Sequence, residues 1–315
     1  MSETIHDEGW LSARKGAGGG ARAGGAHGNG GAGGAAPEGM VLIDMDGTLL
    51  TEARTVAPQD LRTLEELPSR AVVRVIATGR NPFSFFRVAG KGLPLDFLIL
   101  SSGAALWDYA RDRLIRSLSM EPDEVGRAAE IFARLGLELM IHDPVPENHR
   151  FAYFSPKGPS AELRKRLELY EGFARPLSEL PSRWWPASQL LAMDPGDDGG
   201  GTRDRVAALL PDLAVIRATS PLTGSTTWIE VFARGVSKSL TAAWLAAQLG
   251  LPRSKVMAVG NDYNDLDMLE WAGRGYAVRN AQPALRERFT TVASHNEAGV
   301  SEAVLLWLAG QRGGS

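Results

Sequence analysis

The sequence contains no cysteine among its 315 residues, and only five histidines. A chain without cysteine has no disulfide framework, no thiolate metal site and no cysteine nucleophile. Five scattered histidines leave little imidazole chemistry. Any metal site in this protein must therefore be built from oxygen ligands.

The sequence also lacks an excess of charge of either sign. Lys and Arg number 34 against 37 Asp and Glu, so the net charge is -3. Nothing here favours the phosphate backbone of a nucleic acid or an anionic membrane surface as a partner. The oligomeric state cannot be inferred from composition.

Long apolar runs are missing as well. No stretch approaches the roughly 18 residues that span a bilayer, and the N-terminal MSETIHDEGW has no apolar core of the kind found in signal peptides. We therefore expect a cytoplasmic protein.

Glycine is most concentrated near the N-terminus. Residues 16–39 contain 12 of the 36 glycines, and alanine supplies much of the remainder. Such a segment offers few apolar side chains against a high cost in backbone entropy. We predict that residues 1–39 form a disordered Gly/Ala-rich arm.

The chain as a whole has an ordinary globular composition, with 44% apolar and 23% charged residues. Its length predicts about two domains. Short β-branched runs alternate with amphipathic stretches at both ends, and this alternation is typical of α/β folds with a parallel sheet. The predicted strands lie at 41–43, 72–77, 97–100 and 255–259, with weaker ones at 276–278 and 291–293.

The pattern of predicted strands and helices changes in the middle of the chain, at residues 103–225. Hairpin-like pieces alternate with helices there, and Pro and Gly are frequent. We predict an inserted α+β domain over 103–225 that interrupts a core formed by 40–102 plus 226–312.

The sharpest local feature is DMDGTLL, residues 44–50, which follows the first predicted strand. The carboxyl ends of parallel strands are where ligands bind, so Asp44 and Asp46 are placed in the crevice of the sheet. Two carboxylates so close repel each other and favour a bound cation. Oxygen ligands beside a substrate phosphate suit Mg²⁺, although a solvated acidic turn would give the same short pattern.

Three further segments point to the same edge of the sheet. Thr78-Gly79-Arg80 follows the second strand, where a hydroxyl and free backbone donors suit phosphate. Lys238 lies in the first turn of a predicted helix, an unfavourable place for a cation unless an anion is near. The third segment, GNDYNDLDML, brings several side-chain oxygens to the start of a helix: Asn261, Asp262, Asn264, Asp265 and Asp267.

Taken in this order, DxDGTLL, TGR, GVSK and GNDYND resemble the motifs of the haloacid dehalogenase superfamily, and within it the Cof-like phosphatases of subclass IIB. The similarity extends to WIEVFARGVSKSLTAAWL and to NEAGVSEAV near the C-terminus. The resemblance implies a Rossmann-like core with a cap domain inserted between the second and third motifs, and Mg²⁺ as the cofactor.

The resemblance also implies residue roles. Asp44 would be the nucleophile that forms an aspartyl-phosphate, and Asp46 the acid and base. Thr78, Gly79 and Asn264 would bind phosphoryl oxygens, with Lys238 neutralising both nucleophile and phosphate. Mg²⁺ would bind Asp44, the backbone carbonyl of Asp46, and the fourth motif, represented by Asn261 and Asp265.

One departure concerns the fourth motif. The family usually has Asp directly after its glycine, whereas this chain has Asn261, with Asp262 next. Either Asn261 ligates the metal without adding charge, or Asp262 replaces it. We favour Asn261 with Asp265, because a shift of one residue at the end of a strand points the side chain elsewhere.

The sequence thus favours an Mg²⁺-dependent phosphomonoester hydrolase for a small cytoplasmic phosphometabolite, such as a sugar phosphate. Two alternatives remain at this point. One is a phosphomutase or phosphotransferase with the same nucleophile. The other is a catalytically weak protein that binds a phosphometabolite.

Overall fold

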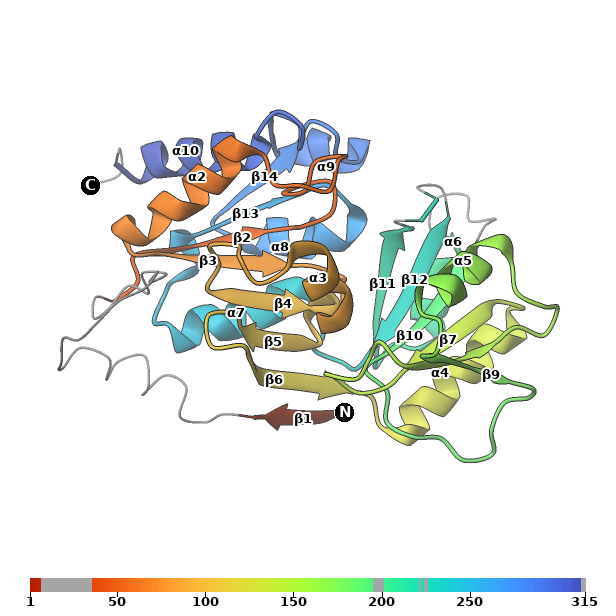
Figure 1. Ribbon diagram of the computed structural model, residues 1–315. Helices are drawn as coiled ribbons and strands as arrows, with labels where there is room; N and C mark the ends of the chain where they lie inside the picture. The colour runs from red at the N-terminus through yellow and green to blue at the C-terminus, as the bar shows by residue number, and fades with distance from the viewer. Residues whose placement is uncertain (7–35, 195–200, 221, 224–225, 313–315) are drawn as a thin grey trace. The chain divides into compact units, whose positions relative to one another are not determined.

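The computed structural model describes residues 1–6, 36–194, 201–220, 222–223 and 226–312. The chain divides into two compact units (Figure 1). The larger unit comprises residues 5–78, 88–116 and 238–315, and the smaller one comprises 1–4, 79–87 and 117–237. No helix in the described ranges is long and apolar enough to span a membrane.

A nine-stranded sheet, which belongs to the larger unit apart from residues 2–4 and 117–119, has the order β1-β6-β5-β4-β3-β2-β13-β14-β15. The six strands from β4 to β15 are parallel to one another, and β5 is antiparallel to β4. The strand bounds are β1 Ser2–Ile5, β2 Gly39–Ile43, β3 Val72–Ala77, β4 Phe97–Leu100, β5 Ala105–Asp108, β6 Arg113–Ser119, β13 Val256–Gly260, β14 Arg274–Val278 and β15 Thr290–Val292.

The central strands are buried along their whole length, as expected for parallel strands covered on both faces. Helices α2 and α10 pack against each other, as do α7 and α8, and Figure 1 shows the two pairs on opposite faces of the sheet. The helix bounds are α2 Pro58–Glu66, α7 Lys238–Gln248, α8 Leu266–Trp271, α9 Pro283–Arg288 and α10 Gly299–Arg312, with α3 Pro82–Ala89 shared between the units. The prediction of an α/β fold around a parallel sheet is confirmed.

The smaller unit contains a six-stranded sheet in the order β11-β12-β10-β7-β8-β9. Neighbouring strands are antiparallel except β8 and β9. Its elements are α4 Pro122–Arg134, β7 Glu138–His142, β8 Phe151–Phe154, α5 Ala161–Leu169, β9 Ala174–Leu177, β10 Gln189–Asp194, α6 Gly201–Leu209, β11 Ala214–Thr219 and β12 Thr227–Phe232. This unit has the α+β character predicted from its alternating hairpin-like and helical segments.

The observed division of the chain differs from the predicted boundaries at 103 and 225. Strand β5 and most of β6 extend the large sheet, because β5 folds back antiparallel onto β4. Strand β12 pairs with β10 and β11, so the smaller unit continues to Ser237.

The prediction of an arm over 1–39 is wrong at both ends. Residues 2–5 form the edge strand β1 beside β6, and β2 already begins at Gly39. Backbone pairing needs no apolar side chains, which is why composition missed β1, all of whose residues are exposed. Residues 7–35 of the predicted arm lie outside the described residues.

Candidate active site

Asp44 lies at the carboxyl end of β2, in the middle of the parallel sheet. Its side chain is only 8% exposed, and its backbone N–H donates to the carbonyl of Val259 in β13 at 3.0 Å. The chain then turns sharply, since Leu49 N and Leu50 N both donate to the carbonyl of Met45. Gly47 adopts a positive φ of 75° in this turn, a conformation that favours glycine.

Lys238 reaches this point from the first turn of α7. Its Nζ donates to Oδ1 of Asp44 at 2.7 Å and to Oδ1 of Asp265 at 2.6 Å, and its side chain is fully buried. Further along α7, the hydroxyl of Thr241 donates to the carbonyl of Gly103 at 2.7 Å. Lys238 therefore starts a helix whose first turns are held against the core.

The three charged groups change one another's ionisation. Burial, helped by the charge of Asp265, raises the pKa of Asp44 to about 7 despite the nearby Lys238. Burial also raises the pKa of Asp265. Burial alone would lower the pKa of Lys238, but Asp265 and Asp44 outweigh it and raise that pKa. Lys238 is therefore a fixed cation between two carboxylates.

Asp265 organises the loop after β13. Its Oδ2 accepts hydrogen bonds from the backbone N–H groups of Asn261 at 2.8 Å and of Asp262 at 3.0 Å. A Cβ on Gly260 would lie 2.7 Å from three atoms of the Asp265 side chain, so the close approach requires glycine there. The Asp265 carboxylate thus bonds to Lys238 through one oxygen and to its own loop through the other.

The side chains of Asn261 and Asp262 lie in different surroundings. Oδ1 of Asn261 accepts from the hydroxyl of Thr48 at 3.2 Å, beside the turn that follows β2. Oδ1 of Asp262 accepts from Nε2 of Gln282 at 3.2 Å. Asn261 is therefore in contact with the segment that carries Asp44 and Asp46.

The other predicted site residues lie on neighbouring segments of the chain. Asp46 follows in the same turn, where its charge contributes to the raised pKa of Asp44. Thr78 is buried at the end of β3, the strand next to β2, and its carbonyl accepts from Ser102 N at 3.0 Å. Gly79 is the first residue of the segment that belongs to the smaller unit, and Asn264 lies in a 3₁₀ turn over Tyr263–Asp265.

The site offers oxygen donors but no preformed metal cluster. Among the described residues, no group of three or more His, Asp or Glu side chains is arranged to hold a metal ion. Lys238 occupies the position between Asp44 and Asp265. Oδ2 of Asp44 has no hydrogen-bond partner in the described part of the chain, and Asn261 adds an amide oxygen. This donor set fits a hard cation such as Mg²⁺.

Sequence analysis overlooked Thr48, Asn280 and Gln282, which contact the two loops of the site. Thr48 belongs to the DMDGTLL segment, and its contact with Asn261 could have been suspected from that neighbourhood. Asn280 and Gln282 follow β14 in a stretch without a recognisable pattern. Nothing in the sequence alone singles them out.

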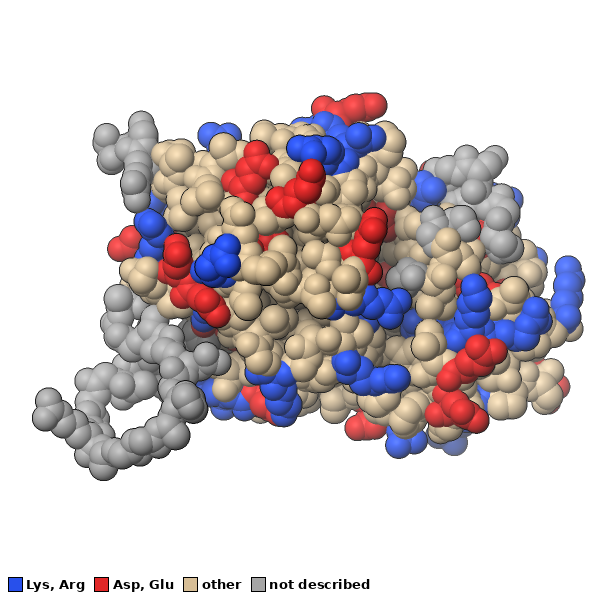
Figure 2. Space-filling model, turned by 45° about the horizontal axis from the view of Figure 1, so that its top comes forward, with Lys and Arg blue, Asp and Glu red and all other residues tan. Residues whose placement is uncertain are grey.

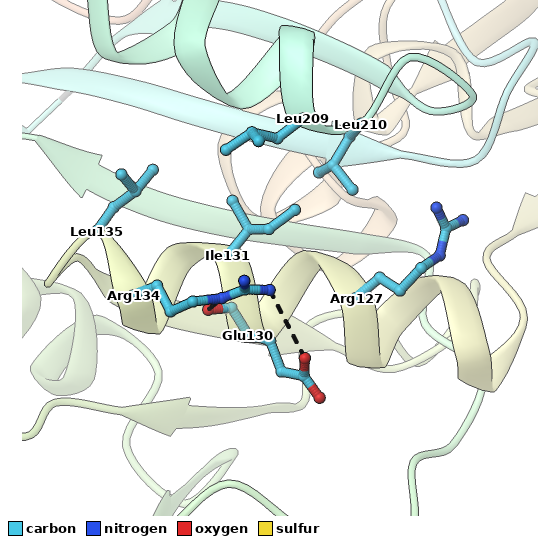
Figure 3. Close-up of a pocket in the computed structure, with 7 residues that line it drawn as sticks. All are labelled: Arg127, Glu130, Ile131, Arg134, Leu135, Leu209 and Leu210. Atoms are coloured by element: carbon cyan, nitrogen blue, oxygen red, sulfur yellow. Dashed lines mark hydrogen bonds and ion pairs between the residues drawn. The ribbon is translucent and has the colours of Figure 1, made fainter.

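A groove elsewhere in the molecule lies between α4 and α6 of the smaller unit (Figure 3). Its volume is about 320 Å³, and it is lined by Arg127, Glu130, Ile131, Arg134, Leu135, Leu209 and Leu210. The lining is aliphatic with an arginine-rich border, and it holds no residue suited to phosphoryl transfer. On the face of the molecule drawn in Figure 2, acidic and basic side chains are interspersed, in keeping with the small net charge.

Comparison with known proteins agrees with this geometry. Residues 41–304 match the family model of haloacid dehalogenase-like hydrolases. The 5-amino-6-(5-phospho-D-ribitylamino)uracil phosphatase YcsE of Bacillus subtilis (strain 168) is 26% identical over 271 residues, which cover 85% of this chain and 95% of the relative. The pyridoxal phosphate phosphatase YbhA of Escherichia coli (strain K12) is 25% identical, with 82% and 93% of the two chains covered.

A solved structure shares the fold. The sugar phosphatase BT4131, of haloacid dehalogenase subclass IIB, superposes with a TM-score of 0.64 at 18% identity, over 85% of this chain and 98% of that one. The chain therefore belongs to the haloacid dehalogenase-like hydrolase family.

Proposed function

We propose that this phosphatase is an Mg²⁺-dependent phosphomonoester hydrolase that works through an aspartyl-phosphate on Asp44. The observation that carries the proposal is the bond between Lys238 Nζ and Oδ1 of Asp44 at 2.7 Å. That bond occupies one carboxylate oxygen and leaves Oδ2 as the nucleophile. It also supplies a positive charge that opposes the effect of burial on the pKa of this carboxylate.

In the first half-reaction, Oδ2 of Asp44 attacks phosphorus in line, and the bond from phosphorus to the ester oxygen breaks. The leaving alkoxide takes a proton from the carboxyl group of Asp46. In the second half-reaction, Asp46 accepts a proton from water, whose oxygen attacks phosphorus. The acyl-phosphate bond breaks, releasing inorganic phosphate and regenerating Asp44.

Charge on the transferring phosphoryl group is balanced by Lys238. Two of its three N–H donors bond to Asp44 and Asp265, and the third has no acceptor among the described residues. That third donor is available to a phosphoryl oxygen. We assign Thr78, Gly79 and Asn264 to the remaining phosphoryl oxygens.

We assign the Mg²⁺ site to Asp44, the backbone carbonyl of Asp46, Asn261 and Asp265. The bound cation would neutralise charge on the phosphoryl oxygens and align the phosphate. Asn261 is preferred over Asp262 because its amide meets Thr48, whereas Asp262 bonds to Gln282. Asp265 would act chiefly by ordering the loop, since its two oxygens already accept three hydrogen bonds.

The proposed substrate is a small phosphorylated metabolite, such as a sugar phosphate, in the cytoplasm. Two relatives are named as phosphatases of small phosphorylated molecules, and a structural neighbour is named as a sugar phosphatase. We propose that the smaller unit is the cap domain that limits access to such compounds. The inserted position of residues 117–237 in the chain supports this role.

The test is release of inorganic phosphate from p-nitrophenyl phosphate and from a panel of sugar phosphates, with and without Mg²⁺. Stoichiometric release supports a hydrolase, whereas an isomerised phosphate ester without release would indicate a mutase. Quenching during turnover in hydroxylamine should convert an acyl-phosphate on Asp44 to a hydroxamate that peptide mass spectrometry detects. A hydroxamate elsewhere would move the nucleophile to another residue.

A further inference from the structure

The loop that follows β14, residues 279–282, contacts both loops that carry the proposed metal ligands. Nδ2 of Asn280 donates to the carbonyl of Gly47 at 2.8 Å, although 233 positions separate the two residues. The backbone N–H of Gln282 donates to the carbonyl of Asn261 at 2.9 Å. This loop therefore joins the turn after β2 to the loop after β13.

The side-chain amide of Asn280 is engaged at both ends. While Nδ2 donates to Gly47, Oδ1 accepts from the backbone N–H of His295 at 3.0 Å. These contacts require one donor and one acceptor on a short side chain. Alanine offers neither, and aspartate offers only the acceptor.

The position of Gly47 matters to Asn261. A Cβ on Gly47 would lie 2.5 Å from Nδ2 of Asn261, so the backbone of the turn and the amide are already closely packed. The next residue, Thr48, donates its hydroxyl to Oδ1 of Asn261 at 3.2 Å. Movement of the turn would therefore change the orientation of the Asn261 amide.

We propose that Asn280 is a positioning residue of the phosphoryl-transfer site. Through its bond to Gly47 it holds the Asp46–Thr48 turn in place against Asn261. This inference rests on the proposed function of that site. Asn280 acts through the backbone of Gly47 and touches no reacting atom. Outer contacts of this kind orient metal ligands, and their loss typically weakens metal binding by about 10- to 100-fold.

The chain offers a matched control in Asn296. It is also an exposed asparagine, and its Oδ1 accepts from the backbone N–H of Glu52 at 3.1 Å, which lies beyond the turn. Asn280→Ala and Asn296→Ala each remove an exposed side-chain amide that bonds to the segment after β2. Asn280→Asp keeps the acceptor for His295 and replaces the donor to Gly47 with a negatively charged oxygen.

The first measurement is amide hydrogen exchange of the metal-free protein, read on the peptide that contains residues 45–50. The N–H groups of Leu49 and Leu50, which close the turn on Met45, report its opening. Faster exchange is expected in Asn280→Ala and Asn280→Asp, and no change in Asn296→Ala. Unchanged exchange in both Asn280 variants, or an equal increase in Asn296→Ala, would overturn the proposal.

The second measurement is calorimetric titration with Mg²⁺ alone, followed by turnover of p-nitrophenyl phosphate. Asn280→Ala should weaken Mg²⁺ binding by about tenfold. The same variant should raise the half-saturating Mg²⁺ concentration for turnover, while its melting temperature stays near that of the parent. General destabilisation would instead lower the melting temperature. A wild-type protein without turnover would refute the proposed function, but the exchange experiment would still decide the role of Asn280.

Discussion

The ammonium group of Lys238 lies 2.7 Å from Oδ1 of Asp44, although 194 positions separate the two residues in the chain. The whole smaller unit, apart from residues 1–4, is inserted between them. The pairing leaves Asp44 with a defined orientation and a single open oxygen. A buried carboxylate whose pKa would otherwise rise further is thereby kept available as a nucleophile.

Asp44→Asn should abolish turnover without unfolding the protein. The amide has nearly the shape of the carboxylate and still accepts from Lys238, but it cannot form an acyl-phosphate. We expect phosphate release to fall by at least about a thousandfold, as for loss of other covalent nucleophiles. Circular dichroism and thermal melting serve as the folding control, and retention of a few per cent of the parent rate would remove Asp44 from this role.

Lys238→Met should destabilise the protein strongly. Removal of the cation leaves Asp44 and Asp265 buried without a counter-charge, and breaking such a buried pair costs about 3–5 kcal/mol. Urea unfolding at pH 8 measures this loss. The double variant Lys238→Met/Asp44→Asn removes one of the stranded charges and should recover part of it. A loss below about 1 kcal/mol in the single variant would show that water or ions reach these carboxylates.

The sheet and the cluster of Asp44, Lys238 and Asp265 could be predicted from the sequence for a physical reason. Parallel strands buried on both faces are continuous apolar runs, so β3 and β4 were predicted at their observed bounds. Residues that end neighbouring parallel strands meet at one edge of the sheet. That rule predicts that Asp44, Thr78 and the segment carrying Asp265 share an edge. The place of Lys238 in the first turn of a helix indicates an anion beside it, and the resemblance adds the role of each residue.

Other features depend on contacts between distant parts of the chain. Strand β12 is defined by pairing with β10 and β11, so the predicted insertion ended too early. The exposed strand β1 pairs through its backbone and has no apolar pattern. The contact between Asn280 and Gly47 depends on where two loops come together after folding. Local secondary-structure propensity carries no information about contacts between distant loops.

Asn261→Asp should lower the Mg²⁺ concentration that gives half-maximal activity. A carboxylate in place of a neutral amide adds a negative charge beside the proposed metal position, worth on the order of 1–2 kcal/mol at a partly solvated site. We therefore expect a several-fold decrease in the half-saturating concentration.

Asp262→Asn is the matched control for this prediction. The side chain at 262 bonds to Gln282, so neutralising it should leave the Mg²⁺ requirement nearly unchanged. The opposite result, with Asp262→Asn abolishing metal dependence and Asn261→Asp without effect, would assign the ligand to Asp262.

His142 is a buried, neutral histidine at the end of β7. Its Nδ1 donates to the carbonyl of Asn148 at 2.9 Å, and Nε2 is buried with no hydrogen-bond partner among the described residues. Burial, with a contribution from the charge of Arg166, lowers its pKa from 6.5 to about 3. The unfolded chain takes up this proton below pH 6.5, whereas the folded protein does so only near pH 3.

The free energy of unfolding should therefore fall as the pH is lowered from 6.5 toward 3, because His142 is protonated in the unfolded chain only. Above pH 6.5 His142 is neutral in both states, and its contribution to the free energy of unfolding is constant. The slope is up to about 1.4 kcal/mol per pH unit for one proton. His142→Gln removes the titrating group, so the difference in unfolding free energy between parent and variant should shrink as the pH is lowered from 7 to 5. Urea unfolding at four pH values measures it, with pH 8 fixing the cost of the substitution itself. Parallel curves for the two proteins over this range would show that His142 takes up its proton in the folded protein as readily as in the unfolded chain.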